Sequence, residues 1–349
     1  MLFNVPVIPD EKLAATLNRH ASSFYSCHFS LYAADVHDGR HKHRLMGTDR
    51  WIEFLRSVRI AKKYLLLNSR SHAHGAYFDP DHLRTVIQTL RSMLSAGVID
   101  GIVFADAYYL QAISDAGEDE VSQLEAIPSV NCMLDTYDRI ASMIDFISST
   151  RFRLPETLIL DRSLNRRLDA LTEVSARCRE MLPAVKLELL ANEGCLYHCP
   201  YKLTHDCHIS MVNMGQALDT QRINRDLGCM RTLQRDPSHL FKSPFIRPED
   251  VAAYEPYVDV LKLCGRTQGA PFLMRVVDAY LHGKHSGNFL DLMDAMDGIA
   301  EWLYVSNDRL PADFLQRLTS CSRECRTCSY CRDLIESCAK PKGISLERL

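Results

Sequence analysis

Thirteen cysteines give this sequence its clearest chemistry, and most of them fall into two groups, one at residues 195–229 and one at residues 321–338. Thiolates ligate zinc and iron–sulfur clusters. In a reducing compartment, where disulfides are rare, such groups indicate metal binding or catalysis. The remaining cysteines stand alone and are typical of small buried side chains: Cys27, Cys132, Cys178 and Cys264.

The first group begins where an apolar run ends. Gly194 permits a sharp turn there, and Cys195 and Cys199 follow it at a spacing that lets two thiolates face one centre. Cys207 and Cys229 can complete four ligands if the chain folds back. The sequence therefore predicts a first metal site held by these four cysteines, with an iron–sulfur cluster and zinc both suited to thiolate ligands.

Histidines within the same segment offer an alternative to one of these cysteines. His198, His205 and His208 could each replace a thiolate ligand. A histidine in a loop is more often solvated or hydrogen-bonded to its neighbours, and we favour that interpretation for His198.

The second group has the spacing Cys321-x3-Cys325-x2-Cys328-x2-Cys331 and could bind a metal by itself. Its first three cysteines have the spacing that radical S-adenosylmethionine enzymes use for a [4Fe–4S] cluster. Such a motif belongs after the first strand of a barrel, whereas here it lies near the end of the chain. We therefore expect a second cluster of auxiliary type, or a structural zinc ion.

Short apolar runs alternate with segments of helical period along most of the chain. We predict helices at residues 81–96, 135–147 and 163–181, and strands at residues 3–7, 27–32, 64–68, 101–105, 129–133, 157–160, 185–190, 240–243 and 258–263. This alternation predicts a parallel sheet covered by helices, and the number of repeats fits a closed (β/α)8 barrel of the TIM type. One strand is in excess of eight, and residues 3–7 and 27–32 are the doubtful pair.

Polar residues follow several of the predicted strands, at the end of a barrel where active sites are found. We expect six of them to line a substrate pocket, and Lys262 and Arg266 are the best candidates for holding an anionic group. Each could instead cap a helix or lie in a polar loop. The six are Asn68, Asp106, Asn131, Glu193, Lys262 and Arg266. No residue is assigned a catalytic role.

The division of the chain and its surroundings are inferred from composition. Residues 1–295 are expected to form the barrel, and residues 296–349 a helical, cysteine-rich C-terminal appendage, with an amphipathic helix predicted at residues 288–304. The formal net charge is only −3, which does not indicate a dedicated nucleic-acid or membrane surface. The N-terminal residues lack the features of a signal peptide, and no apolar stretch is long enough to span a bilayer. A cytoplasmic protein is expected.

Several segments together resemble the U32 peptidase-like family. The run Asn-Glu-Gly-Cys-Leu-Tyr-His-Cys-Pro at residues 192–200 is similar to the cysteine loop of that family. Residues 161–165, 243–250, 261–266 and 280–292 resemble further segments of its layout. The resemblance implies a barrel-like fold and a four-cysteine [4Fe–4S] cluster. The cysteine spacing is tighter than in the better-known branches, and the C-terminal cysteines are additional.

The resemblance also implies two classes of function. Several branches of the family are similar to oxygen-independent hydroxylation factors for RNA or quinone precursors, and others are called proteases. We therefore expect a [4Fe–4S]-dependent modification enzyme acting on a small molecule, peptide or RNA nucleotide, served by a protein partner or electron donor. The alternative is a U32-type peptidase, or a metalloprotein whose metal site is structural.

Overall fold

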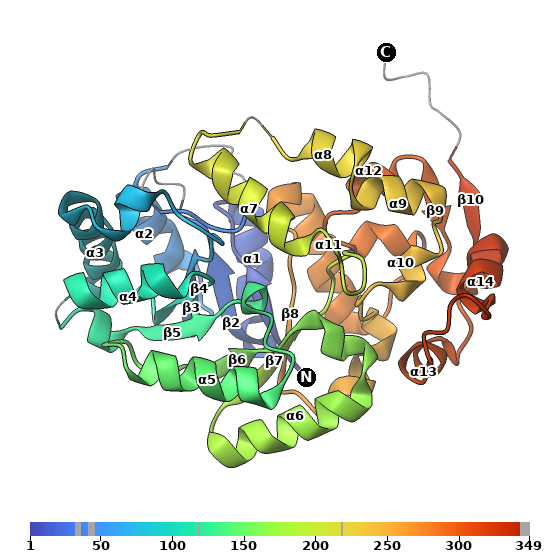
Figure 1. The fold of residues 1–349 in the computed structure, drawn as a ribbon, viewed down its shortest axis with the longest axis horizontal. Helices are drawn as coiled ribbons and strands as arrows, with labels where there is room; N and C mark the ends of the chain where they lie inside the picture. The colour runs from blue at the N-terminus through green and yellow to red at the C-terminus, as the bar shows by residue number, and fades with distance from the viewer. Residues whose placement is uncertain (32–35, 41–45, 118, 218, 343–349) are drawn as a thin grey trace.

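The computed structural model describes residues 1–31, 36–40, 46–117, 119–217 and 219–342. Eight parallel strands form one sheet in the order β5-β4-β3-β2-β1-β8-β7-β6 (Figure 1). A bridge from Glu125 to Arg153 brings the two edge strands, β5 and β6, side by side, so that the barrel is nearly closed. The strands are β1 (Leu2–Pro6), β2 (Phe24–Phe29), β3 (Lys62–Leu67), β4 (Gly101–Phe104), β5 (Glu125–Pro128), β6 (Thr157–Ile159), β7 (Lys186–Leu190) and β8 (Val260–Lys262).

Successive strand residues point alternately out of the barrel and into it. Outward residues such as Leu65 and Ile102 join the large core beneath the helices. Inward residues of β3 to β6 form a separate apolar cluster of Tyr64, Leu66, Val103, Ile127 and Ile159. The strands on the other side, β1, β2, β7 and β8, place buried polar side chains inside instead, namely Asn4, His28, Glu188 and Lys262. The barrel interior is therefore half apolar and half polar.

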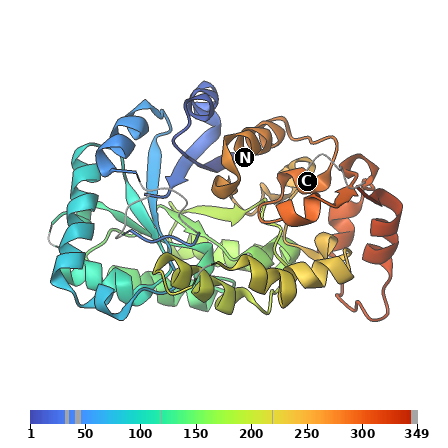
Figure 2. The same cartoon turned by 90° about the horizontal axis from the view of Figure 1, so that it is seen from above.

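Helices follow most of the strands and surround the barrel (Figure 1). They are α1 (Glu11–Arg19), α2 (Thr48–Ser57), α3 (Pro80–Ser95), α4 (Ala107–Ala116), α5 (Tyr137–Ser148), α6 (Leu168–Met181) and α11 (Gly269–His282). The connection from β7 to β8 is longer and carries α7 (Lys202–Asn213), α8 (Gln221–Asp226), α9 (Cys229–Arg235) and α10 (His239–Lys242). Figure 2 shows this yellow segment running along one side of the molecule, from the barrel towards the C-terminal elements.

The C-terminal elements pack beside the barrel rather than closing it. They are α12 (Asp297–Ala300), β9 (Leu303–Val305), α13 (Phe314–Thr319), α14 (Tyr330–Cys338) and β10 (Ala339–Pro341), and β10 pairs antiparallel with β9. Their buried residues, such as Phe314 and Leu334, belong to the same core cluster as the outer face of the barrel. A domain boundary at residues 295 and 296 stays a prediction. Among the described helices, none combines the length and apolar composition needed to cross a membrane.

The barrel prediction is confirmed, but the excess strand was assigned wrongly. Residues 3–7 and 27–32 correspond to the true strands β1 and β2, whereas residues 240–242 lie in the short helix α10 and Ser243 follows it. The Asp236 carboxylate accepts a hydrogen bond from the Ser238 amide and starts a turn there. Leu240 and Phe241 are apolar because they are buried against the core, and this burial does not require a strand.

Two further predictions were wrong at their boundaries or in type. Residues 129–133 are largely a 3-10 turn (η4, Val130–Cys132), and the strand lies just before them as β5. Sequence reasoning passed over β5 because Glu125 and Pro128 are unfavourable in strands. Residues 288–304 form no single helix; they contain η8 (Phe289–Leu292), α12 and β9. The helices predicted at residues 81–96 and 135–147 are confirmed as α3 and α5, and residues 163–181 contain most of the turn η5 (Arg162–Arg166) and all of α6.

Candidate functional site

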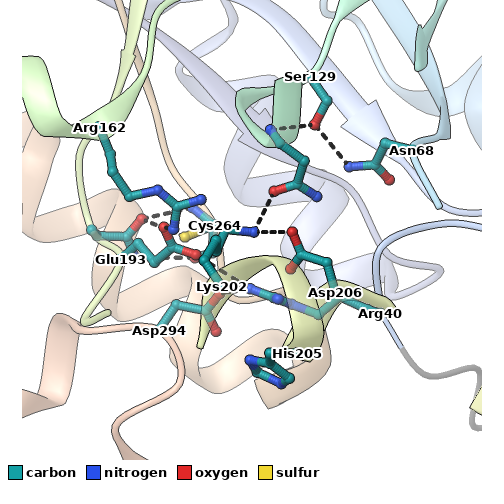
Figure 3. Close-up of polar contacts among 12 residues, drawn as sticks. Arg40, Asn68, Ser129, Arg162, Glu193, Lys202, His205, Asp206, Cys264 and Asp294 are labelled. Atoms are coloured by element: carbon teal, nitrogen blue, oxygen red, sulfur yellow. Dashed lines mark hydrogen bonds and ion pairs between the residues drawn. The ribbon is translucent and has the colours of Figure 1, made fainter. Parts of the chain in front are cut away.

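Helix α7 crosses the end of the barrel at which the strands finish. In its first turn, Lys202 Nζ donates a hydrogen bond to Asn131 Oδ1, which follows β5, at 2.8 Å (Figure 3). One turn further on, Asp206 pairs with Lys202. Ser69, which follows β3, donates from its hydroxyl to Ser210 Oγ at 3.0 Å. Helix α7 is therefore tied to two strand ends and covers the barrel mouth between them.

Four charged side chains from separate connections meet beneath this helix (Figure 3). Arg162, which follows β6, forms a buried ion pair with Glu193, which follows β7. Arg40 lies 2.8 Å from Asp294 and 4.0 Å from Glu193. Burial and the Arg40 charge act in opposite directions on the Asp294 carboxyl, and the outcome is a lowered pKa. The pairs hold four connections together, because an uncompensated buried charge would be costly.

Hydrogen bonds of residues 192–194 fix the start of the cysteine loop. The Asn192 side chain donates to the carbonyls of Cys264 and Leu292, both at 3.0 Å, and accepts from the Cys264 amide at 2.7 Å. The Gly194 amide donates to the Asp294 carbonyl at 3.1 Å. A Cβ at Gly194 would lie 2.3 Å from Met296 Cγ and 3.1 Å from the Asp294 carbonyl oxygen, so any larger residue would require Met296 to shift.

In the first cysteine group, Cys199 lies within electrostatic range of both Cys195 and Cys229. Cys195 and Cys199 come from the loop between β7 and α7, and Cys229 begins α9. Burial raises the pKa of all three, and Cys199 raises the pKa of Cys195 and Cys229 further. Arg162 and Lys202 oppose this rise at Cys195 and Cys199, because a nearby cation stabilises a thiolate.

The fourth predicted ligand of this group is placed differently. Cys207 lies on α7 and is exposed. Cys264, predicted to be an isolated buried cysteine, follows β8 and lies near Cys195. Burial first, and then Asp294, raise the pKa of Cys264 well above its usual range. The structure thus offers Cys264 beside Cys207 as the fourth thiol.

Both kinds of metal centre can be tested against this arrangement. Over the part of the chain that the structure describes, no three His, Cys, Asp or Glu side chains lie close enough together to hold a single metal ion. A four-iron cluster is several atoms wide, so its thiolates lie further apart than those around one ion. The thiolate donor set and the neighbouring cations therefore fit an iron–sulfur cluster better than a lone zinc ion.

Three of the predicted substrate-binding residues have structural partners. Asn68 accepts from the Gly39 amide at 2.9 Å and donates to Ser129 Oγ at 3.3 Å, and Asn131 accepts from Lys202 as described above. Asp106 caps α4 by accepting from the Tyr109 amide at 3.2 Å. Asn68 and Asn131 thus lie at the mouth, whereas the carboxylate of Asp106 is engaged locally.

Asp106 also belongs to a pair with a histidine. Its carboxylate lies 3.1 Å from His72 Nδ1 and accepts from the Tyr77 hydroxyl at 2.6 Å. Burial would raise the pKa of Asp106, but these hydrogen bonds outweigh it and lower the pKa. Within the described residues, His72 Nε2 has no hydrogen-bond partner.

Lys262 and Glu188 lie within the barrel, below the mouth. Lys262 Nζ is 3.5 Å from Glu188 Oε1, and Asn4 donates to both oxygens of Glu188 at 3.1 and 3.0 Å. Burial lowers the pKa of Lys262 and raises that of Glu188, and both shifts favour the neutral pair. Lys262 Nζ makes no hydrogen bond to any described residue, so it keeps donors that a ligand could use.

Arg266 follows β8 and already has an anionic partner. Its Nε donates to Ser30 Oγ at 2.8 Å, and its guanidinium lies 3.2 Å from the Asp38 carboxylate. An anionic ligand would therefore have to compete with Asp38 for this arginine.

The mouth also contains charged residues that sequence reasoning missed. Lys202 could have been found, because it lies directly after the cysteine loop. Arg40 and Asp294 carry no local signal, since each reaches the site from a connection remote in sequence. The second cysteine group lies elsewhere: Cys321, Cys325 and Cys328 fall between α13 and α14, and Cys331 is in the first turn of α14.

Comparisons with known proteins give one relative and a set of similar folds. No family model matches the chain. The "Uncharacterized protease MJ1657" of Methanocaldococcus jannaschii is 28% identical over 297 residues, which cover 83% of this chain and 82% of the relative.

A solved structure described as "The Structure of the U32 Peptidase Mk0906" has the same fold, with a TM-score of 0.50 and 15% identity, covering 76% of this chain and 93% of that one. Orotidine 5'-monophosphate decarboxylase from Sulfolobus solfataricus matches with a TM-score of 0.33 and 10% identity, covering 62% of this chain and 99% of that one, which is too remote to bear on function.

Proposed function

From its relationship to the U32 family, which the archaeal relative and the shared fold support, we propose that this chain is a [4Fe–4S]-dependent modification enzyme. It would catalyse oxygen-independent hydroxylation, or a related tailoring reaction, on a small molecule, peptide or RNA nucleotide. In the hydroxylation a C–H bond would become C–OH with oxygen from water, and two protons and two electrons would leave to an external electron acceptor. The observation that carries the proposal is that Cys199 lies within electrostatic range of both Cys195 and Cys229, with Arg162 and Lys202 beside Cys195 and Cys199 at the barrel mouth.

These three cysteines would hold the cluster, with a fourth thiolate from Cys264 or Cys207. Cys264 is favoured by its nearness to Cys195, and Cys207 by its place on α7 shortly after the loop. When bound, such a cluster supplies electron transfer or an iron that binds substrate. Its thiolates bring negative charge into a buried site, and Arg162 and Lys202 reduce the cost of that charge.

The surrounding residues would orient the substrate and keep water away. Lys262 lies in the polar half of the barrel interior, and its Nζ makes no hydrogen bond to a described residue. Helix α7 covers the site through a few side-chain hydrogen bonds, including Lys202 with Asn131 and Ser69 with Ser210. A peptide or RNA substrate that reached the buried thiols would have to displace these contacts, whereas a small molecule would displace fewer of them.

A peptidase is the second candidate, and the names of the relative and of the similar structure favour it. His72 with Asp106 resembles a general base held by a carboxylate. A nucleophile would have to reach His72 Nε2, and no described residue hydrogen-bonds to that atom. The proposal of a cluster-dependent enzyme therefore rests on the cysteines and not on His72 and Asp106.

The experiment is an anaerobic purification followed by a search for a modified product. Equal amounts of iron and sulfide are expected. Cells that lack this protein should contain an RNA nucleotide, peptide or small molecule that is lighter by one oxygen atom, and the wild-type chain should restore its mass whereas Cys195→Ser should not. Proteolysis of a peptide library that survives Cys195→Ser but is lost in His72→Ala would instead establish the peptidase.

A further inference from the structure

Arg166 is a part-buried cation without a carboxylate partner. Its Nε and Nη2 donate to the Leu318 carbonyl at 3.3 and 3.1 Å, and its Nη1 donates to the carbonyls of Phe241 and Ser243 at 2.8 and 3.2 Å. Carbonyls satisfy the donors of a guanidinium but do not neutralise its charge. Among the described residues, no carboxylate forms an ion pair with Arg166, so a nearby negative charge is missing.

Two thiols of the second cysteine group, Cys321 and Cys331, lie within electrostatic range of the Arg166 guanidinium. As thiolates they would supply the missing negative charge. Burial lowers the pKa of Arg166, and Cys331 and Cys321 are among the groups that act against this change. Cys331 in turn lies within electrostatic range of Cys321 and Cys325. A fourth cysteine, Cys328, lies between them in sequence and is exposed like Cys325. The four cysteines come from one short segment, and two of them, Cys321 and Cys331, lie within electrostatic range of Arg166.

The backbone of this segment donates a hydrogen bond to one of its sulfur atoms and has an unusual conformation next to it. The Arg323 amide donates to Cys321 Sγ at 3.3 Å. Arg323 has a φ of 64°, in the left-handed region that a non-glycine residue rarely adopts. The turn continues from Glu324 to Thr327 through a backbone hydrogen bond of 3.1 Å. An amide directed at a thiol within a strained turn is the arrangement expected where a sulfur carries negative charge.

From these contacts we infer that Cys321, Cys325, Cys328 and Cys331 form a second, tetrathiolate metal site that is independent of the barrel mouth and is balanced by Arg166. No three donors of the described residues lie close enough together for a single ion, so the site is assigned to an iron–sulfur cluster, which is wider and would place a net negative charge beside the guanidinium. Lys242 adds a second cation near Cys331. Two of the four ligands are part-buried and two are exposed, so the cluster would lie near the surface.

This site also reaches the first cysteine loop. Tyr197 lies between Cys195 and Cys199 in sequence, and its hydroxyl accepts a hydrogen bond from Arg323 Nη1 at 3.1 Å. The guanidinium carbons of Arg166 and Arg323 lie 5.8 and 6.0 Å from the centre of the Tyr197 ring. A metal cluster that holds the turn at Arg323 in place would therefore also restrain the loop that carries Cys195 and Cys199, through the contact of Arg323 with Tyr197.

Metal content of the full-length protein tests the site. Cys325→Ser and Cys328→Ser change exposed residues and should each remove the iron and sulfide of one cluster, while the iron of the cluster at the barrel mouth is retained. Cys338→Ala, which alters a buried cysteine of the same segment, is the matched control and should change nothing. Unaltered metal content in the Cys325→Ser/Cys328→Ser double variant would overturn the inference. Cys195→Ser should remove only the iron of the cluster at the barrel mouth. Failure of the proposed function is therefore distinguished from failure of this second site.

Trypsin provides a readout that does not depend on activity. Arg323 and Arg326 lie within the ligand segment and should resist cleavage while the metal is bound. Chelation, or Cys325→Ser, should expose them to rapid cleavage. Arg166→Gln should weaken metal retention against a chelator on the order of 10- to 100-fold, whereas the exposed Arg84→Gln should not. Equal retention in Arg166→Gln and Arg84→Gln would overturn the role of Arg166, and equal cleavage with and without metal would overturn the ordering of the turn.

Discussion

Lys202 and Asn131 are joined across the barrel mouth, with Lys202 Nζ 2.8 Å from Asn131 Oδ1. The contact connects the first turn of α7 with η4, which follows β5. Burial, followed by the charge of Arg162, lowers the pKa of Lys202 from 10.5 to about 8, although Asp206 acts against both. Helix α7 is therefore anchored by the Lys202 amine, which titrates within an accessible pH range.

The titration of Lys202 predicts a pH dependence of stability. The unfolded chain binds the lysine proton up to a higher pH than the folded chain, so this group makes the unfolding free energy rise as the pH increases from about 8 to 10.5. Lys202→Met should flatten that part of the profile. Urea unfolding at a series of pH values measures it, with the exposed Lys284→Met as control. A profile for Lys202→Met that superimposes on the wild type would refute the shifted pKa.

The Arg162–Glu193 pair should be strongly coupled. Removing one partner leaves a buried charge with weaker compensation, and we expect Arg162→Met or Glu193→Gln to cost about 3–5 kcal/mol of unfolding free energy. The double variant should cost less than the sum of the two. The exposed pair Arg84–Asp81 is the control and should contribute about 1 kcal/mol or less. Additive losses in the double-mutant cycle would show that the two side chains do not interact.

Gly194 should tolerate no side chain. Gly194→Ala places a methyl group against Met296 and the Asp294 carbonyl, and we expect a loss of about 1–3 kcal/mol. Met296→Ala in the same chain should recover part of that loss by making room. Gly75→Ala, where no atom lies within 4 Å of the added carbon, is the control. The midpoint of thermal or urea unfolding measures this loss. A midpoint equal to that of the wild type for Gly194→Ala would contradict the close approach.

The two candidates for the fourth ligand give opposite expectations. Ser at Cys195, Cys199 or Cys229 should remove the barrel iron, because each thiol is a proposed ligand of the cluster. Cys264→Ser should do the same if the buried thiol completes the site, while Cys207→Ser leaves the iron in place. The reverse result would assign Cys207. Iron and sulfide analysis after anaerobic purification measures both, with Cys178→Ser as the control that should retain the full amount.

Arg266 is expected to act on an anionic substrate only by exchanging its partner Asp38. Arg266→Ala should then reduce turnover or substrate binding by orders of magnitude while cluster content stays near wild type, since buried charged contacts are worth roughly 2–5 kcal/mol. Asp38→Asn in the same chain should recover stability but not activity. A lower melting temperature with intact turnover would mean that Arg266 only neutralises Asp38.

Features that depend on local sequence could be read without the structure. The alternation of short apolar runs with helical periods predicted the barrel, because each βα unit buries its own faces in a regular way. The helix α3 was found within a residue at each end, since Asp79 caps it and Pro80 begins it. The glycine turn before Cys195 and the closeness of Cys199 to it were likewise matters of spacing. Strand β5 was missed because its buried Glu125 is neutralised by Lys62, a partner from another strand that local propensity cannot see.

The composition of the barrel mouth was decided only by tertiary structure. Arg40 and Asp294 form their ion pair although 254 residues separate them in sequence. The residues next to either one give no indication that the other is its partner. Cys264 comes close to Cys195 because the ends of β7 and β8 are neighbours in the sheet, whereas Cys207, closer in sequence, is carried to the exposed side by the turn of α7. Spacing along the chain determined which residues could do chemistry. Strand order, helix rotation and the need to pair buried charges determined which of them meet.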